Sequence, residues 1–182
     1  MRLFFALWPD TLTQQRWHDD LANYVKPLGG RRVPAANLHL TLAFLGEVPG
    51  TRINSLLQLG DDLPADPFTL RFDRIESWKK PALACLRPAD VPAPLTRLVG
   101  LLQTGLRLEG FGLDARAFKP HVTLSRDIVI PADSLPVWPV LEWSADRIAL
   151  VRSERTAEGA HYHLVGRWPT DFPCRPVLPA RR

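Results

Sequence analysis

The chain has 182 residues, 46% of them hydrophobic and 23% charged, a length and composition that suit one domain with its own buried core. It contains no run of about 18 apolar residues and no charged-then-apolar leader, so the sequence indicates neither a membrane helix nor a secretory signal. Its two cysteines, Cys85 and Cys174, are too few for a disulfide framework and lack metal-ligand spacing. We therefore expect a cytoplasmic protein. The formal net charge of +4 favours an anionic partner such as RNA or a nucleotide.

In chain order, the first half begins with a strand over residues 2–8. An amphipathic helix is predicted over 12–28, with one apolar face, and Gly29-Gly30 ends it. A strand over 38–45 comes next, then a short helix over 52–59 and a strand that contains residues 73–75. The residues on the apolar face of the first helix are Trp17, Leu21, Tyr24, Val25 and Leu28.

The second half repeats this order. A strand is predicted over 82–87, a helix over 95–108, a stop at 110–112 and a strand that begins at residue 121. A Pro-rich connection, a strand containing 146–148 and a last strand over 161–168 complete the ordered part. We interpret residues 1–172 as a single two-lobed domain built from halves of about 1–80 and 81–172, with 173–182 as a loose basic tail.

The same tetrapeptide pattern lies in both halves, at His39-Leu40-Thr41-Leu42 and at His121-Val122-Thr123-Leu124. Period-2 alternation sets His39 and Thr41 on one face of their strand, opposite the apolar side chains of Leu38, Leu40, Leu42 and Phe44. In the second strand, His121, Thr123 and Ser125 share a face. Each strand is therefore predicted to present a His and a Thr side by side.

Two such pairs suit in-line chemistry on a phosphodiester. With an unperturbed pKa near ~6.5, His can act as general acid or general base at neutral pH. The hydroxyls of Thr41 and Thr123 can donate hydrogen bonds to the non-bridging oxygens, where negative charge builds in the transition state. The residues themselves do not say which His is the acid. The structural alternative is a pair of core histidines satisfied by neighbouring hydroxyls.

Arg126 comes shortly after the second motif and could neutralise a phosphate. Strict alternation sets it on the face away from Thr123, so it reaches the phosphate only if the strand twists or ends at Ser125. Its alternative role is a surface ion pair with Asp127.

Other polar and aromatic candidates compete with structural roles. His161 and His163 share a strand face with metal-ligand spacing, but no third ligand is evident, so we expect no metal. His18 is expected on the solvated side of the first helix. Arg31-Arg32 could guide an RNA backbone, although an exposed loop pair is the default. Trp78, Phe5 or Phe118 could stack a base, whereas most aromatic side chains belong to the core.

The motifs and their flanks resemble those of the two-histidine (2H) phosphoesterases, within which the RNA 2′,3′-cyclic phosphodiesterases were formerly called bacterial 2′-5′ RNA ligases. The resemblance spans nearly the whole chain. The segments that carry the resemblance are residues 2–6, 37–46, 118–126 and 150–153, followed by Tyr162 near the end. It implies an α+β, bilobal, pseudo-twofold fold with antiparallel sheets around a central cleft, and catalysis without metal or cofactor. It also implies that His39 protonates the departing 3′ oxygen, that His121 is the base and that a 2′-phosphate is formed, with Arg126 near the phosphate.

These observations support three functional hypotheses. The first is hydrolysis of 2′,3′-cyclic phosphates on RNA ends or nucleotides by a monomeric enzyme. The second is the reverse reaction, which joins such an end to a 5′-hydroxyl in a 2′-5′ bond. The third is a nucleotide- or RNA-binding module that uses the cleft without turnover. The paired imidazoles favour the first, because binding alone has no need of two proton-transfer groups.

Overall fold

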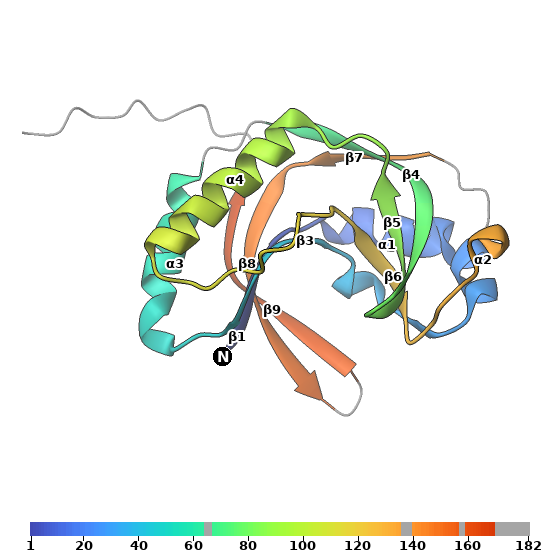
Figure 1. Ribbon diagram of the computed structural model, residues 1–182, viewed down its shortest axis with the longest axis horizontal. Helices are drawn as coiled ribbons and strands as arrows, with labels where there is room; N and C mark the ends of the chain where they lie inside the picture. The colour runs from blue at the N-terminus through green and yellow to red at the C-terminus, as the bar shows by residue number, and fades with distance from the viewer. Residues whose placement is uncertain (64–66, 136–139, 157–158, 170–182) are drawn as a thin grey trace, which may run out of the picture.

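Nine strands form one sheet in the computed structural model of the protein, which describes residues 1–63, 67–135, 140–156 and 159–169. The order across the sheet is β7-β4-β5-β6-β3-β1-β8-β9, and β2 pairs with β6 (Figure 1). All of the pairings are antiparallel. The strands are β1 (Arg2–Leu7), β2 (Arg31–Arg32), β3 (Leu40–Glu47), β4 (Phe68–Lys79), β5 (Ala82–Pro88), β6 (Val122–Arg126), β7 (Leu141–Ala145), β8 (Arg147–Thr156) and β9 (Gly159–Pro169).

The helices lie in two groups on either side of the sheet's centre (Figure 1). They are α1 (Thr11–Asp20), α2 (Ala22–Val25), α3 (Ile53–Asp62) and α4 (Ala93–Leu108), with 3₁₀ turns at Lys26–Leu28, Ala35–Asn37, Gly50–Arg52 and Ala132–Ser134. Contacts join α3 to β8 and β9, and α4 to β3. On the other side, Trp17 of α1 packs edge-on against Phe72 of β4 and Trp143 of β7.

The two motif-bearing strands are neighbours at the centre of the sheet. β3 pairs with β6 through Leu40 and Val122, and the strands outward from this pair are arranged in matching order: β1, β8 and β9 beyond β3, and β5, β4 and β7 beyond β6. This matching order parallels the repeated order of elements along the sequence. It also shows an exchange, because β4 pairs with β5 while β8 pairs with β1, so the long strand after each motif lies on the other motif's side.

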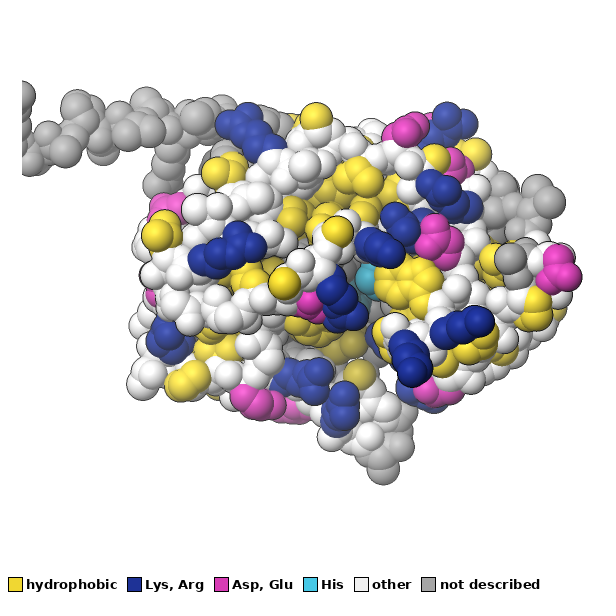
Figure 2. Space-filling view, viewed as in Figure 1, with side chains coloured by type: hydrophobic (Ala, Val, Ile, Leu, Met, Phe, Trp, Pro, Cys, Tyr) yellow, Lys and Arg dark blue, Asp and Glu magenta, His cyan; other side chains and the backbone are white. Residues whose placement is uncertain are grey.

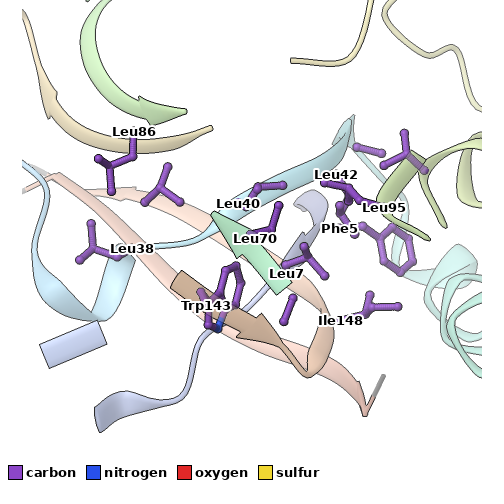
Figure 3. Close-up of a cluster of buried hydrophobic side chains, with 14 of the residues drawn as sticks. Phe5, Leu7, Leu38, Leu40, Leu42, Leu70, Leu86, Leu95, Trp143 and Ile148 are labelled. Atoms are coloured by element: carbon purple, nitrogen blue, oxygen red, sulfur yellow. The ribbon is translucent and has the colours of Figure 1, made fainter. Parts of the chain in front are cut away.

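Helix faces and strand centres supply the core as the apolar periodicity predicts. All five residues predicted to align on the second helix are buried in α4: Leu95, Leu98, Val99, Leu102 and Leu106. Figure 3 shows side chains from distant segments meeting in the hydrophobic core, with Phe5 and Leu7 of β1 near Leu40 and Leu42 of β3. The α+β class and antiparallel arrangement are confirmed.

The prediction of one continuous helix over 12–28 is wrong. α1 ends at Asp20 and α2 begins at Ala22, and the chain then tightens into a 3₁₀ turn over Lys26–Leu28. Pro27 has no backbone N–H to donate, so the last turn of a regular helix cannot form around it.

β7 was not predicted as a separate strand, and the predicted tail with Cys174 lies outside the described residues. Within the described parts of the chain, no helix is long and apolar enough to cross a membrane.

Candidate active site

His39 and His121 flank the central strand pair and open onto one cleft. Each precedes the first residue of its strand, and Leu40 pairs with Val122. Continuing that antiparallel register by one residue in each direction sets His39 level with Thr123 and Thr41 level with His121. All four side chains line a cleft of about 770 Å³. Figure 2 shows a His side chain at the base of this hollow, with Lys and Arg side chains around it.

A β-bulge in each motif strand reverses the facing of the side chains beyond the Thr. In β3, Ala6 pairs with Thr41 but Phe5 pairs with Ala43, so Leu42 is the extra residue. In β6, Cys85 pairs with Thr123 but Ala84 pairs with Ser125, so Leu124 is extra. Because an extra residue shifts the alternation by one position, the side chains three residues after each Thr turn into the cleft.

These two side chains are Phe44 and Arg126, and both line the cleft. The prediction that Phe44 joins the apolar face is therefore wrong: its side chain is 57% exposed. Strict alternation also misplaced Arg126, since the bulge at Leu124 brings it to the face of Thr123. Its alternative partner, Asp127, pairs instead with Arg31, with 3.0 Å between Arg31 Nε and Asp127 Oδ2.

A backbone carbonyl fixes the orientation of each imidazole. His39 Nδ1 donates to the carbonyl of Asn37 over 2.7 Å, and His121 Nδ1 donates to that of Lys119 over 2.8 Å. In both cases the acceptor lies two residues earlier in the chain. This arrangement leaves Nε2 of each ring as the nitrogen that can exchange a proton with a substrate. His39 Nε2 is also 3.1 Å from Thr41 Oγ1.

The ring of His39 is enclosed by aromatic side chains, which together with Phe44 we call the His39 wall. Trp8 stacks on it at 5.2 Å and 14°, Phe4 lies at 5.0 Å, and Tyr162 meets it edge-on at 5.2 Å. Burial lowers the pKa of His39 to about 4, aided by the positive charge of Arg126 and opposed by the Asn37 carbonyl.

The ring of His121 has a different setting, the His121 wall, made of Glu76, Trp78 and Arg87. Trp78 lies 4.5 Å from the imidazole, and its indole N–H donates to Glu76 over 3.0 Å. Arg87 also donates to Glu76, over 3.2 Å. Burial lowers the pKa of His121, as do the charges of Arg87 and Arg126, whereas the Lys119 carbonyl and the Glu76 carboxylate act in the opposite direction.

Two buried polar side chains that were not predicted from the sequence hold the motifs in place. Gln14 of α1, 4% exposed, donates to the carbonyl of Leu38 over 3.0 Å and to that of Ala36 over 3.3 Å. It thereby anchors the segment whose Asn37 carbonyl orients His39. The prediction that Ser125 shares a face with His121 and Thr123 is wrong, because the bulge at Leu124 turns its side chain away from the cleft. It is fully buried and donates to the Gly29 carbonyl over 2.8 Å. Sequence periodicity identifies neither role, because each depends on contacts between distant segments.

The adjacent turn requires glycine. Gly30 has a φ of +72°, and a Cβ there would come within 2.5 Å of the Arg126 carbonyl. A larger residue would therefore push the turn away from the second motif strand.

Some of the remaining sequence candidates lie at the cleft, and others serve the structure. Phe5 is fully buried in the core, so its proposed stacking role is wrong, whereas Trp78 and Phe118 line the cleft. Arg32 donates to the His18 carbonyl. His163 pairs with Glu154 at 3.2 Å, and across the described ranges no cluster of three or more His, Cys, Asp or Glu has the geometry of a metal site.

Comparisons with known proteins show which family the chain resembles and which solved structures share its fold. A sequence profile of the family described as LigT-like phosphoesterase matches residues 8–84. The chain is 34% identical over 170 residues to the RNA 2′,3′-cyclic phosphodiesterase of Escherichia coli, covering 92% of this chain and 95% of that protein. The Thermus thermophilus protein of the same name is 33% identical, with 91% and 88% covered. The crystal structure of E. coli LigT with 3′-AMP superposes with a TM-score of 0.79 at 30% identity, over 92% of this chain and 97% of that one.

Proposed function

The chain belongs to the LigT-like phosphoesterase family, and we propose on that basis that it is an RNA 2′,3′-cyclic phosphodiesterase whose acid and base are His39 and His121. The observation that carries the proposal is the convergence of both imidazoles, from separate halves of the chain, on one cleft. The relatives of the same name match over nearly their full length. A related protein was crystallised with 3′-AMP, which supports a nucleotide end as the substrate.

The reaction requires a proton to leave on one side of phosphorus and another to arrive on the opposite side. We assign His121 as the base that takes a proton from water while the water oxygen bonds to phosphorus. His39 gives its proton to the 3′ oxygen as the P–O3′ bond breaks, which leaves a 2′-phosphate. Both transfers use Nε2, because each Nδ1 is engaged with a carbonyl. The same two proton transfers, run in the reverse direction, would join a 2′,3′-cyclic end to a 5′-hydroxyl.

Thr41, Thr123 and Arg126 stabilise the charge that develops on the phosphate. Across the strand pair, Thr41 lies level with His121 and Thr123 lies level with His39. Each hydroxyl can therefore donate to a non-bridging oxygen when the phosphate lies between the two imidazoles. Charge-assisted bonds of this kind are worth about 1.5–3 kcal/mol each. Arg126 supplies a full positive charge on the same cleft surface.

The bound anion also adjusts the protonation of the rings. With its pKa lowered to about 4, His39 in the empty cleft is mainly neutral at pH 7. A phosphodiester between the rings carries a negative charge, which favours the protonated form of both imidazoles and raises their pKa values. The donor role of His39 therefore depends on substrate binding.

Turnover of 2′,3′-cyclic AMP by the purified protein and its His39→Ala and His121→Ala variants tests the proposal. We expect each variant to lose about 10³-fold or more in kcat while remaining folded by circular dichroism. His18→Ala, which changes a His outside the cleft, serves as the matched control and should retain the rate. EDTA should leave the wild-type rate unchanged.

A chelator-sensitive rate, or a His39 or His121 variant with near wild-type turnover, would contradict the two-histidine mechanism. Binding of nucleotides without any hydrolysis would instead support a binding module. Incubation with cleaved tRNA halves and separation of the products tests the reverse reaction in the same samples.

We also propose that the protein acts as a monomer, because the residues of both motifs that line the cleft come from one chain. The expected cytoplasmic location remains a prediction from the sequence.

A further inference from the structure

Trp8 lies face to face with His39, unlike the other rings around the imidazole. The indole and the imidazole are 5.2 Å apart and 14° from parallel, whereas Phe4 is tilted by 34° and Tyr162 lies at 87° to His39. An aromatic face carries partial negative charge, and a parallel indole presents this face to the imidazole. The two rings are close enough for attraction of a cation, which extends to about 6 Å from the ring centre.

A second small core, separate from the main one, fixes the position of Trp8. Trp8 is 7% exposed, and its backbone N–H donates to the Arg147 carbonyl over 3.0 Å. Three rings of this core contact His39, so the core supports the catalytic ring as well as the sheet. Its buried members, with Tyr162 packed against them, are Phe4, Ala6, Trp8, Ala149 and Val151.

The charged groups near His39 oppose the proton that this ring carries as donor. Burial lowers the pKa of His39 to about 4, and the charges of Arg126 and His121 act in the same direction. The Asn37 carbonyl, which accepts from Nδ1, favours the charged ring. The other charged side chains that line the cleft within the described residues are Lys80, Lys119 and the ion pair of Asp114 with Arg116.

An indole can favour the charged ring without adding a negative charge to the site. A carboxylate beside His39 would repel the phosphodiester that has to bind there. The face of Trp8 attracts a cation and leaves the net charge of the cleft unchanged, and this attraction is stronger where water is excluded. Trp8 therefore favours protonation of His39 while the cleft stays attractive to an anion.

We propose that Trp8 is a positioning residue for the proton donor, and that its indole face binds the imidazolium that His39 becomes in the substrate complex. The proposal rests on the proposed function, in which His39 is the donor. Trp8 is not among the residues that line the cleft, so it acts through His39 and not on the substrate. It should therefore affect kcat more than KM.

Titration of His39 with sulfate bound separates this role from simple burial. Sulfate supplies an anion of constant charge, and NMR of the imidazole, assigned with His39→Ala, follows the proton. We expect Trp8→Leu and Trp8→Met, which remove the aromatic face, to lower the pKa of His39 and its proton affinity about tenfold. Trp8→Phe, which keeps a ring, should lower them less. If Trp8 only excluded water, these smaller side chains would admit water and raise the pKa of His39 towards its ordinary value.

Steady-state rates on 2′,3′-cyclic AMP provide the second readout. Trp8→Leu should lower kcat at pH 8 about tenfold and leave KM within about twofold of wild type, because the fraction of protonated donor falls. Trp8→Phe should recover most of kcat. Trp143→Leu is the matched control, since it removes a buried Trp that packs on Trp17 in the main core. It should change neither kcat nor the titration of His39.

A pKa of His39 that is unchanged or raised in the folded Trp8→Leu and Trp8→Met variants would overturn the proposal. Equal losses of kcat in Trp8→Leu and Trp8→Phe would also overturn it, because the effect would then follow size and not the aromatic face. Absence of hydrolysis by the wild type would overturn the proposed function instead. The titration with sulfate does not depend on hydrolysis, so the two failures are distinguishable.

Discussion

The two walls of the cleft share a backbone plan but differ in chemistry. Ala6 pairs with Thr41 in one and Cys85 pairs with Thr123 in the other. Two residues after these positions, Trp8 follows the end of β1 and Arg87 lies in β5. Trp8 stacks on His39, whereas Arg87 binds the Glu76 carboxylate beside His121. The two walls therefore hold the same His and Thr positions but differ in the side chains around them.

The two walls give the rings different proton affinities, but in the empty cleft His39, the assigned proton donor, is held strongly neutral, so its donor role requires the bound phosphodiester to raise its pKa. One must start with a proton and the other without, and identical surroundings would give both rings the same proton affinity. The His39 wall is aromatic and strongly favours the neutral ring, as the pKa of about 4 shows. The pKa of His121 is also lowered, chiefly by burial, and its wall combines Arg87, which lowers that pKa, with the Glu76 carboxylate, which raises it.

The largest effect expected beyond the histidines themselves is at the two hydroxyls. Thr41→Val and Thr123→Val preserve shape and remove the donor, so each should lower kcat about 10- to 100-fold, which corresponds to one charge-assisted hydrogen bond. Thr41 also contacts His39 Nε2, and its variant should therefore be the more impaired. Steady-state rates on 2′,3′-cyclic AMP measure both.

Thr104→Val is the matched control, because Thr104 is exposed on α4 and bonds only within that helix, to the Gly100 carbonyl. It should leave kcat unchanged. Wild-type rates in both Thr41 and Thr123 variants would show that the hydroxyls do not stabilise the phosphate.

A smaller and more selective effect is expected at Glu76. Replacing it with Gln removes the negative charge that favours protonated His121 and leaves the charges of Arg87 and Arg126, which oppose protonation. Glu76→Gln should therefore lower the pKa of His121 further below 6.5 while that of His39 stays near 4. NMR titration of the imidazole resonances, assigned with the two His→Ala variants, measures both values.

Glu109→Gln serves as the control for this titration, since Glu109 pairs with Arg52 at the end of α4. An equal shift of both histidines in Glu76→Gln, or no shift of His121, would mean that the two walls do not differ in their effect on the rings.

Local periodicity predicted much of the fold from the sequence. The alternation around His39 and His121 identified both motif strands, and the spacing of Leu95 to Leu106 identified α4 and its buried face. These features depend on residues close together in the chain, whose side chains share a face whatever the tertiary contacts. The family resemblance supplied the overall arrangement, which spacing alone did not.

The parts that the sequence did not predict depend on pairing between distant strands. Alternation set Phe44 in the core and Arg126 away from Thr123, and both positions were reversed by bulges that arise only when β3 meets β1 and β6 meets β5. Gln14 could not be linked to His39 without knowing that α1 packs beside the 3₁₀ turn at Ala35–Asn37. The cleft therefore depends most on the contacts that were hardest to predict.

The central claim is that two imidazoles act on one phosphorus from opposite sides. A crystal structure with a nucleoside 2′,3′-cyclic vanadate, which adopts the trigonal-bipyramidal geometry of the transition state, tests it most directly. We predict that Nε2 of His39 and Nε2 of His121 each lie within hydrogen-bond distance of an apical oxygen, one on either side of vanadium, with Thr41 and Thr123 on the equatorial oxygens. A complex in which only one imidazole reaches an apical oxygen, or in which both approach from the same side, would contradict the account.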